Sequence, residues 1–252
     1  MFAADLIYVT LGNNTITTYD VSLSSASAIA ASAQTFVSGN LNFPEGLAFD
    51  SSGNLYAANN NNNTISKFNS AGSFQTTLGS GNLGHPFGLA VDSSGNLYAA
   101  NIGNSTISKF NSAGVFQATL GSGNLNGPFG LAFDSSGNLY AANYLGGTIS
   151  KFNSAGSFQA TLGSGNLNGP SGLAFDSSGN LYAANASNNT ISKFGPSGTF
   201  LTTLGSGNLN FPIGLAFDGS GNLYAANNGN NTISKFGPSG NFLFSWATTG
   251  SP

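Results

Sequence analysis

Short apolar segments alternate with polar turns along most of the chain, and the pattern returns every 42 residues. The unit that starts at Gly46 contains four such segments, which read "GLAFD" (46–50), "LYAAN" (55–59), "TISKF" (64–68) and "SFQTTLG" (73–79). Turn sequences rich in Asn, Ser and Gly separate them, and no segment shows helical periodicity. The pattern therefore predicts four short β-strands in each unit.

The units follow one another without insertion, as the prolines that open them show: Pro44, Pro86, Pro128, Pro170 and Pro212. A period near 42 residues with four strands is typical of the blades of a β-propeller. The N-terminal segment holds only three further predicted strands, 6–10, 14–20 and 33–39. We therefore predict one all-β domain over residues 1–252, a six-bladed β-propeller of four-stranded repeats whose first blade lacks its innermost strand. The blades are expected at approximately 1–43, 44–85, 86–127, 128–169, 170–211 and 212–252.

The missing strand leaves open how the ring closes. The last segment, "NFLFSWATTGSP", aligns with a fourth strand, so side-chain packing between the first and last blades could close the ring. Residues 2–5 ("FAAD") could instead fill the gap, or a partner chain could donate the strand. We expect a closed, monomeric ring.

The unit "PEGLAFDSSGNLYAANNNNNTISKFNSAGSF" resembles the NHL repeat in its Pro-Xaa-Gly start, its Asp-ending strand, its Gly-Asn turn and its Lys-Phe strand end. The resemblance covers residues 44–242 in five copies, and the first blade, with "IYVTLGNNTITTYD", is similar to the YVTN-type propeller repeat. NHL resemblance implies six blades, in agreement with the count above. It also implies a range of functions, because some NHL proteins bind proteins or RNA, and others and related propellers are lyases or lactonases with a metal on the axis. NHL units often carry an acidic residue where this chain has an asparagine: Asn59, Asn101, Asn143, Asn185 and Asn227.

Antiparallel strand order predicts which turns share a face of the ring. The nearly identical turns "DSSGN" and "NSAGS" are expected together on one face. The opposite face is expected to carry the connection around each proline and the turn after each second strand, which reads NNNN, IGNS, YLGG, ASNN or NGNN. The repeats differ mainly on this second face, and loops on a rigid scaffold are common binding sites.

We therefore predict a ligand-binding surface on the face where the repeats differ. Its candidate contacts are Phe43, Glu45, His85, Phe87, Phe129, Tyr144 and Ile213. Random change after duplication would produce the same variation, so drift at unconstrained positions is the alternative interpretation.

The residues that repeat in every unit are interpreted as structural. Each repeated aspartate is expected to cap its own turn by accepting backbone N–H bonds, although a ring of carboxylates around a cation is an alternative: Asp50, Asp92, Asp134, Asp176 and Asp218. Each repeated lysine is expected to extend along its blade or to pair with a neighbouring carbonyl or Asp. His85 is the only histidine and the chain has no cysteine, so we predict no metal site, no catalytic residue and no cofactor.

The composition narrows the classes of function. Only 5% of the residues are charged, arginine is absent and the net charge is -3, which argues against a nucleic-acid surface and against docking on anionic membranes. The absence of cysteine leaves the redox compartment open, although a charge-poor, Asn/Thr-rich chain suits an extracellular or cell-surface location. We predict a non-catalytic binding or scaffold propeller for a protein or glycan. Two alternatives stay open, namely an engineered or recently amplified repeat without an evolved ligand, and a propeller enzyme of the lyase or lactonase type.

Overall fold

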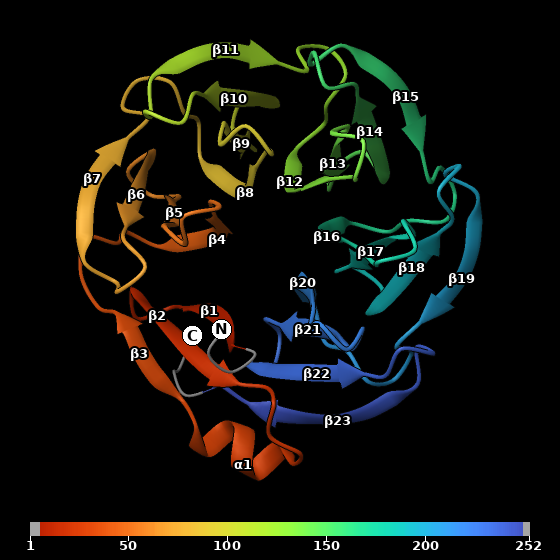
Figure 1. Cartoon of the computed structure of the whole chain (residues 1–252). Coiled ribbons are helices and arrows are strands. Elements are labelled where there is room, and N and C mark those ends of the chain that lie inside the picture. Colours follow the sequence, from red (N-terminus) through yellow and green to blue (C-terminus); the bar gives the residue numbers. More distant parts are fainter. Residues whose placement is uncertain (1–5, 249–252) are drawn as a thin grey trace.

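Six antiparallel β-sheets stand around a central axis, and each sheet is one blade of a propeller (Figure 1). The structure is a computed structural model that describes residues 6–248. Five blades have four strands and blade one has three. The prediction of an all-β, six-bladed propeller whose first blade lacks its innermost strand is therefore confirmed. Among the described residues, no helix has the length and apolar character needed to cross a membrane.

The strands of each blade follow one another in chain order from the axis outward. Blade one contains β1 (Leu6–Leu11), β2 (Thr15–Asp20) and β3 (Gln34–Val37). Blade two contains β4 (Pro44–Phe49), β5 (Leu55–Asn59), β6 (Thr64–Phe68) and β7 (Phe74–Leu78). Blade three contains β8 (Pro86–Val91), β9 (Leu97–Asn101), β10 (Thr106–Phe110) and β11 (Phe116–Leu120). Blade four contains β12 (Pro128–Phe133), β13 (Leu139–Asn143), β14 (Thr148–Phe152) and β15 (Phe158–Leu162). Blade five contains β16 (Pro170–Phe175), β17 (Leu181–Asn185), β18 (Thr190–Phe194) and β19 (Phe200–Leu204). Blade six contains β20 (Pro212–Phe217), β21 (Leu223–Asn227), β22 (Thr232–Phe236) and β23 (Phe242–Ala247).

The hydrophobic core lies between the blades rather than within one of them. A separate cluster of buried side chains fills each of the six junctions between neighbouring blades. Between blades three and four it includes Tyr98, Ala100 and Ile107 on one side and Leu131, Leu139 and Phe152 on the other. No blade could bury both faces of its sheet alone, so the ring is the unit that folds.

A buried asparagine at the end of each second strand joins its blade to the connection that precedes it. In blade four, Asn143 accepts a hydrogen bond from the N–H of Asn126 (3.1 Å), and its Nδ2 donates to Thr148 Oγ1 (3.1 Å) and Ser150 Oγ (2.9 Å). Ser150 Oγ in turn donates to the carbonyl of Asn124 (2.6 Å). A carboxylate could not donate these bonds, so the position requires the amide of an asparagine.

The face with the nearly identical turns is held by an Asp–Tyr–Lys group in each of blades two to six. In blade two, Asp50 Oδ1 accepts from the N–H groups of Ser52 (3.0 Å) and Asn54 (2.9 Å), and Tyr56 donates its hydroxyl to Oδ2 (3.2 Å). The ammonium of Lys67 lies 5.0 Å from the centre of the Tyr56 ring and 3.9 Å from Asp50. Burial alone would raise the pKa of Asp50, but the hydrogen bonds from Asn54 and Ser52 outweigh it and lower the pKa. These carboxylates are therefore engaged by their own turns.

Side-chain packing between blades six and one closes the ring. Trp246 of β23 packs against Tyr19 of β2, with ring centres 6.4 Å apart, and against Tyr224 of β21 at 6.1 Å. The segment between β2 and β3 adds a short helix, α1 (Ala26–Ala31), which buries Ile29 in the same cluster. Periodicity did not predict this helix because its six residues are too few to show a pattern; Ser25 caps it by accepting from Ala28 N–H (3.3 Å). Residues 2–5, the other candidate for closing the ring, lie outside the described residues.

The buried asparagines generate a test of blade packing. Asn143→Asp replaces the Nδ2 donor by an acceptor and buries a charge, so we expect the free energy of unfolding at pH 7 to fall by about 2–3 kcal/mol. Urea unfolding measures this loss, and part of the stability should return near pH 4 as the new carboxyl is protonated. The matched control is Asn166→Asp at an exposed position, which should change stability by less than about 0.5 kcal/mol. Equal effects of the two variants would contradict a structural role for the buried set.

Candidate functional site

The face on which the repeats differ is called the variable face here. It consists of the turns at 60–63, 102–105, 144–147, 186–189 and 228–231 and the connections that lead into β4, β8, β12, β16 and β20. The turn and the connection of one blade are joined directly, since the N–H of Tyr144 donates to the carbonyl of Gly127 (3.0 Å). The turn also reaches the next blade, where Asn63 Oδ1 accepts from the N–H of His85 (2.6 Å). Turns and connections therefore lie on the same rim.

The residue before each proline has a left-handed backbone. The φ angle is 52° at Phe43, 50° at His85 and 49° at Phe211, and glycines occupy the same position in the other two repeats (Gly127 and Gly169). A residue with a Cβ atom costs about 1–2 kcal/mol in this conformation, whereas glycine adopts it freely. Phe and His thus occupy a position where the backbone favours Gly. Strain of this kind is common at functional sites.

Three aromatic rings from the predicted set form one stack. The ring centres of Phe87 and Phe129 are 3.9 Å apart with an interplanar angle of 28°. Tyr144 continues the stack on Phe129 at 4.5 Å and 20°. Phe87 and Phe129 begin two neighbouring inner strands, and Tyr144 begins the turn beside them, so the propeller geometry brings together residues that are up to 57 positions apart. All three rings are half-buried.

The other predicted contacts are distributed around the same rim. Phe43 and His85 are exposed beside their prolines, and Ile213 lies half-buried at the start of β20. Sequence reasoning missed two exposed apolar side chains, Leu145 (65% exposed) and Phe211 (37% exposed). Both lie in segments already recognised as variable, so their positions in the repeat could have identified them.

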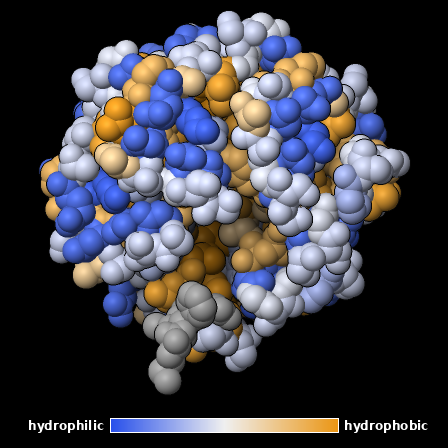
Figure 2. All heavy atoms as spheres, turned by 45° about the horizontal axis from the view of Figure 1, so that its top comes forward, coloured by the Kyte–Doolittle hydropathy of each residue, from blue (hydrophilic) through white to orange (hydrophobic). Residues whose placement is uncertain are grey.

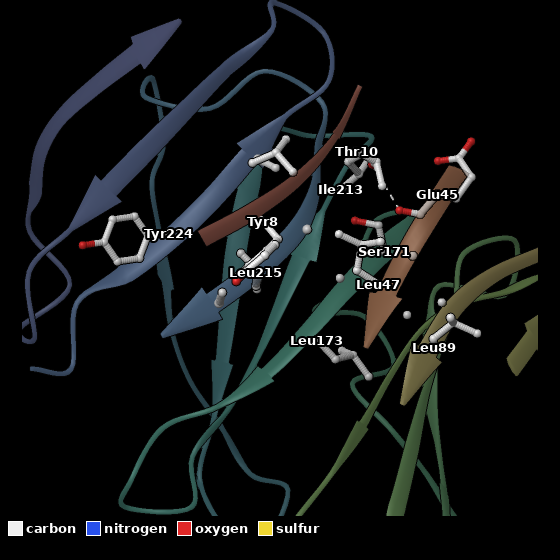
Figure 3. Close-up of a pocket in the computed structure, with 18 of the residues that line it drawn as sticks. Tyr8, Thr10, Glu45, Leu47, Leu89, Ser171, Leu173, Ile213, Leu215 and Tyr224 are labelled. Carbon is white, nitrogen blue, oxygen red and sulfur yellow. Dashed lines mark hydrogen bonds between the residues drawn. The ribbon is translucent and has the colours of Figure 1, made fainter. Parts of the chain in front are cut away.

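A central cavity opens inside the ring. Its volume is about 390 Å³, and it is lined by β1 and by the inner strands of the other five blades. Figure 2 shows a central hollow lined by hydrophobic residues, with hydrophilic residues covering the blades around it. Leu47, Leu89 and Leu173 lie in the wall, while Glu45 and Thr10 lie at one end (Figure 3).

Glu45 is the one predicted polar contact that lines the cavity. Its carboxylate points away from the leucines of the wall (Figure 3), and its backbone carbonyl accepts a hydrogen bond from Thr10 Oγ1 (3.2 Å). Burial raises the pKa of Glu45 from 4.5 to about 7. A carboxyl with this pKa exists in both protonation states near neutral pH, so it could either donate a hydrogen bond to a ligand or accept a proton from one.

Within residues 6–248, no three side chains of His, Cys, Asp or Glu gather closely enough to hold a metal ion. His85 lies exposed on the rim. The five repeated aspartates cap their own turns instead of gathering around a cation.

The raised pKa of Glu45 generates a test by linkage. Between about pH 4.5 and pH 7 the folded protein retains a proton that the unfolded chain releases, so wild-type stability should fall as the pH rises through this range. Relative to Glu45→Gln, which cannot titrate, the wild type should lose about 1 kcal/mol of unfolding free energy between pH 5 and pH 8. This figure allows for partial solvent screening of the carboxyl. Urea unfolding of both proteins at pH 5, 6, 7 and 8 measures the difference. A difference that does not vary with pH would show that Glu45 titrates normally.

Comparison with solved structures identifies proteins that share the fold of this chain. Among solved structures, a chain of a nidogen/laminin complex superposes with a TM-score of 0.83 at 22% identity, covering 97% of this chain and 94% of that one. A streptogramin B lyase superposes with a TM-score of 0.68 at 18% identity, covering 83% of this chain and 70% of the lyase chain. A catalytically inactive variant of virginiamycin B lyase from Staphylococcus aureus, solved with quinupristin, superposes with a TM-score of 0.72 at 14% identity. The match covers 99% of this chain and 87% of the lyase chain. At these identities the structural likeness shows the fold alone.

Sequence comparison goes further than the fold. No curated protein sequence matches the chain. The profile of the Virginiamycin B lyase family, however, matches residues 30–245, which is most of the sequence. The NHL resemblance of the repeats stays a prediction, while the six-bladed architecture that it implied is confirmed. The chain belongs to the Virginiamycin B lyase family.

Proposed function

We propose that this propeller is a non-catalytic binding module that holds a partner protein on its variable face. The observation that carries the proposal is the stack of Phe87, Phe129 and Tyr144. Aromatic rings provide large contact areas with little conformational entropy to lose, and they are enriched where proteins bind one another. The stack lies on the rim among the loops in which the repeats differ.

The exposed apolar residues of the rim support the same proposal. Phe43, Leu145 and Phe211 lie on the variable face at 47%, 65% and 37% exposure. Two of these residues, Phe43 and Phe211, adopt the left-handed conformation described above, so random drift does not account well for them. An aliphatic side chain such as Leu145 suits a protein surface better than a glycan, whose hydroxyls need hydrogen-bonding groups. The fold is also used by a chain that assembles in a nidogen/laminin complex, which is consistent with a protein partner.

A selection experiment tests this function. A displayed peptide library and a glycan array are screened with the wild-type protein, and hits are titrated against the double variant Phe87→Ala/Phe129→Ala. We expect peptide hits whose affinity falls at least tenfold in the double variant, since stacked aromatic contacts at an interface are commonly worth about 2 kcal/mol or more. The matched control is Phe158→Ala, an exposed phenylalanine on the outer strand β15, which should leave the affinity unchanged.

Three outcomes would contradict the proposal in different ways. Hits on the glycan array alone would replace the protein partner by a glycan. The absence of any hit would favour a repeat amplified without an evolved ligand. A large loss of melting temperature in the double variant would make the two phenylalanines core residues rather than contacts.

A lyase-type enzyme is the second candidate function, and two observations favour it. The family is named for virginiamycin B lyase, and Glu45 has a pKa of about 7 at the end of the central cavity. A carboxyl of this kind is suited to act as a general base or acid near neutral pH. Incubation with quinupristin followed by mass spectrometry tests this candidate. Cleavage by the wild type that is lost in Glu45→Gln would establish an enzyme. If quinupristin stays intact with both proteins, the lyase candidate fails and the binding proposal stands.

A further inference from the structure

The gap in blade one has the form of an empty strand position. In blades two to six, the second strand pairs with an inner strand on one side and a third strand on the other. In blade one, β1 occupies the place of a second strand: Tyr8 packs against Phe49 of the next blade, as Tyr98 packs against Phe133. Among the described residues, β1 pairs with β2 alone, so its edge toward the axis has no strand beside it.

The walls of the gap are left less buried than their counterparts elsewhere in the ring. Ala226 of blade six faces the gap and is partly exposed, whereas Ala100, Ala142 and Ala184 at the same repeat position are fully buried. Ala216 of β20 is exposed, while at the same repeat position Ala48, Ala132 and Ala174 are half-buried and Ala90 is buried. In each of these comparisons, the difference is the inner strand that the next blade contributes. The gap joins the central cavity, and its lining is mainly apolar (Figure 3).

The glycines of the inner strands show how closely a strand would fit. A methyl group on Gly88 or Gly130 would overlap a carbonyl oxygen of the next inner strand, and one on Gly172 would lie 2.7 Å from the carbonyl oxygen of Ile213. Inner strands therefore touch backbone to backbone at this position. Among the described residues, a methyl group on Gly214 would meet nothing nearer than the Ala226 side chain, at 3.6 Å. Within residues 6–248, no inner strand of blade one lies beside Gly214.

We infer that blade one binds an extended peptide segment of a partner polypeptide, which adds to the edge of β1 and completes the inner layer of the ring. The chemistry of the segment follows from the five positions that are filled, each of which takes the pattern Pro-Xaa-Gly-Leu-Ala followed by Phe or Val. The segment needs glycine at the third position, where it passes the backbone of Glu45, and small or apolar residues after it. Main-chain hydrogen bonds to β1 supply affinity, and the glycine contact supplies selectivity.

The chemistry of the gap favours an extended polypeptide as its occupant. The edge of β1 offers main-chain groups, and the residues around it are mainly apolar. At the four filled junctions, the inner strand passes its neighbour at a glycine with no room for a side chain. An extended segment with glycine at the third position meets these requirements together.

A peptide taken from the chain itself is the probe. A fluorescein-labelled peptide with the sequence of residues 43–50, FPEGLAFD, is titrated with the protein, and anisotropy reports binding. We expect saturable binding to the wild type, together with a higher melting temperature at excess peptide. The control peptide carries Gly46→Val and should bind at least tenfold more weakly, because its side chain would overlap the Glu45 backbone.

The matched protein variants are Gly214→Ala and Gly219→Ala, because neither glycine has a positive φ angle. A methyl group at Gly214 is accommodated in the free protein but would strike the incoming backbone, so this variant should melt like the wild type and bind the peptide at least tenfold more weakly. A methyl group at Gly219 has no atom within 4 Å and should change neither property. Leu145→Ala, on the rim and outside the lining of the cavity, should leave peptide affinity within twofold, which separates this inference from the binding function proposed above.

Each remaining outcome overturns the inference. Absence of binding at about 1 mM peptide would show that the gap is not a strand site. Equal affinities for the wild type and Gly214→Ala would place the peptide elsewhere. Binding that appears only after removal of residues 1–5 would identify the chain's own N-terminal segment as the occupant.

Discussion

The contact between neighbouring inner strands at the axis is the constraint on which the rest of this ring depends. Four junctions bring the glycine of one Pro-Xaa-Gly segment against the backbone of the next, with no room for a side chain. This approach draws the blades into a closed circle and fixes the distance at which the second and third strands meet. The clusters of Ala, Tyr, Leu, Ile and Phe between blades are then filled at a constant spacing, which explains why the repeats tolerate so little change there.

The same geometry divides the two faces of the ring. On one face, every turn has an Asp that accepts backbone N–H groups and a Tyr–Lys pair beside it, so each residue has a packing task. On the other face, the buried asparagine anchors the connection from below and leaves the outer part of each turn facing solvent. Variation collects where side chains are free of the core. A stack such as Phe87–Phe129–Tyr144 can form there without disturbing the blades beneath it.

Blade one departs from this plan and gives the ring its asymmetry. Closure relies on aromatic packing around Trp246 and on α1 instead of on a strand shared between the first and last blades. Within residues 6–248, the inner layer consequently has five strands for six blades, and β1 lines the central cavity. Membership in the Virginiamycin B lyase family describes the architecture, but the function of a propeller resides in the groups that its cavity and rim present.

The sequence by itself determined the number of blades, the number of strands in each and the division into two faces, because a 42-residue period and alternating strand direction leave little freedom. It also indicated which residues cap turns, since an Asp before Ser-Gly-Asn acts within its own turn. Tertiary structure alone decided that Phe87 stacks on Phe129 and that Glu45 has a raised pKa, because both depend on which blades become neighbours around the axis. The helix at Ala26–Ala31 and the openness of Gly214 were likewise decided only there. Local patterns specify strands and turns, but burial and close approach arise only when neighbouring blades pack against one another around the axis.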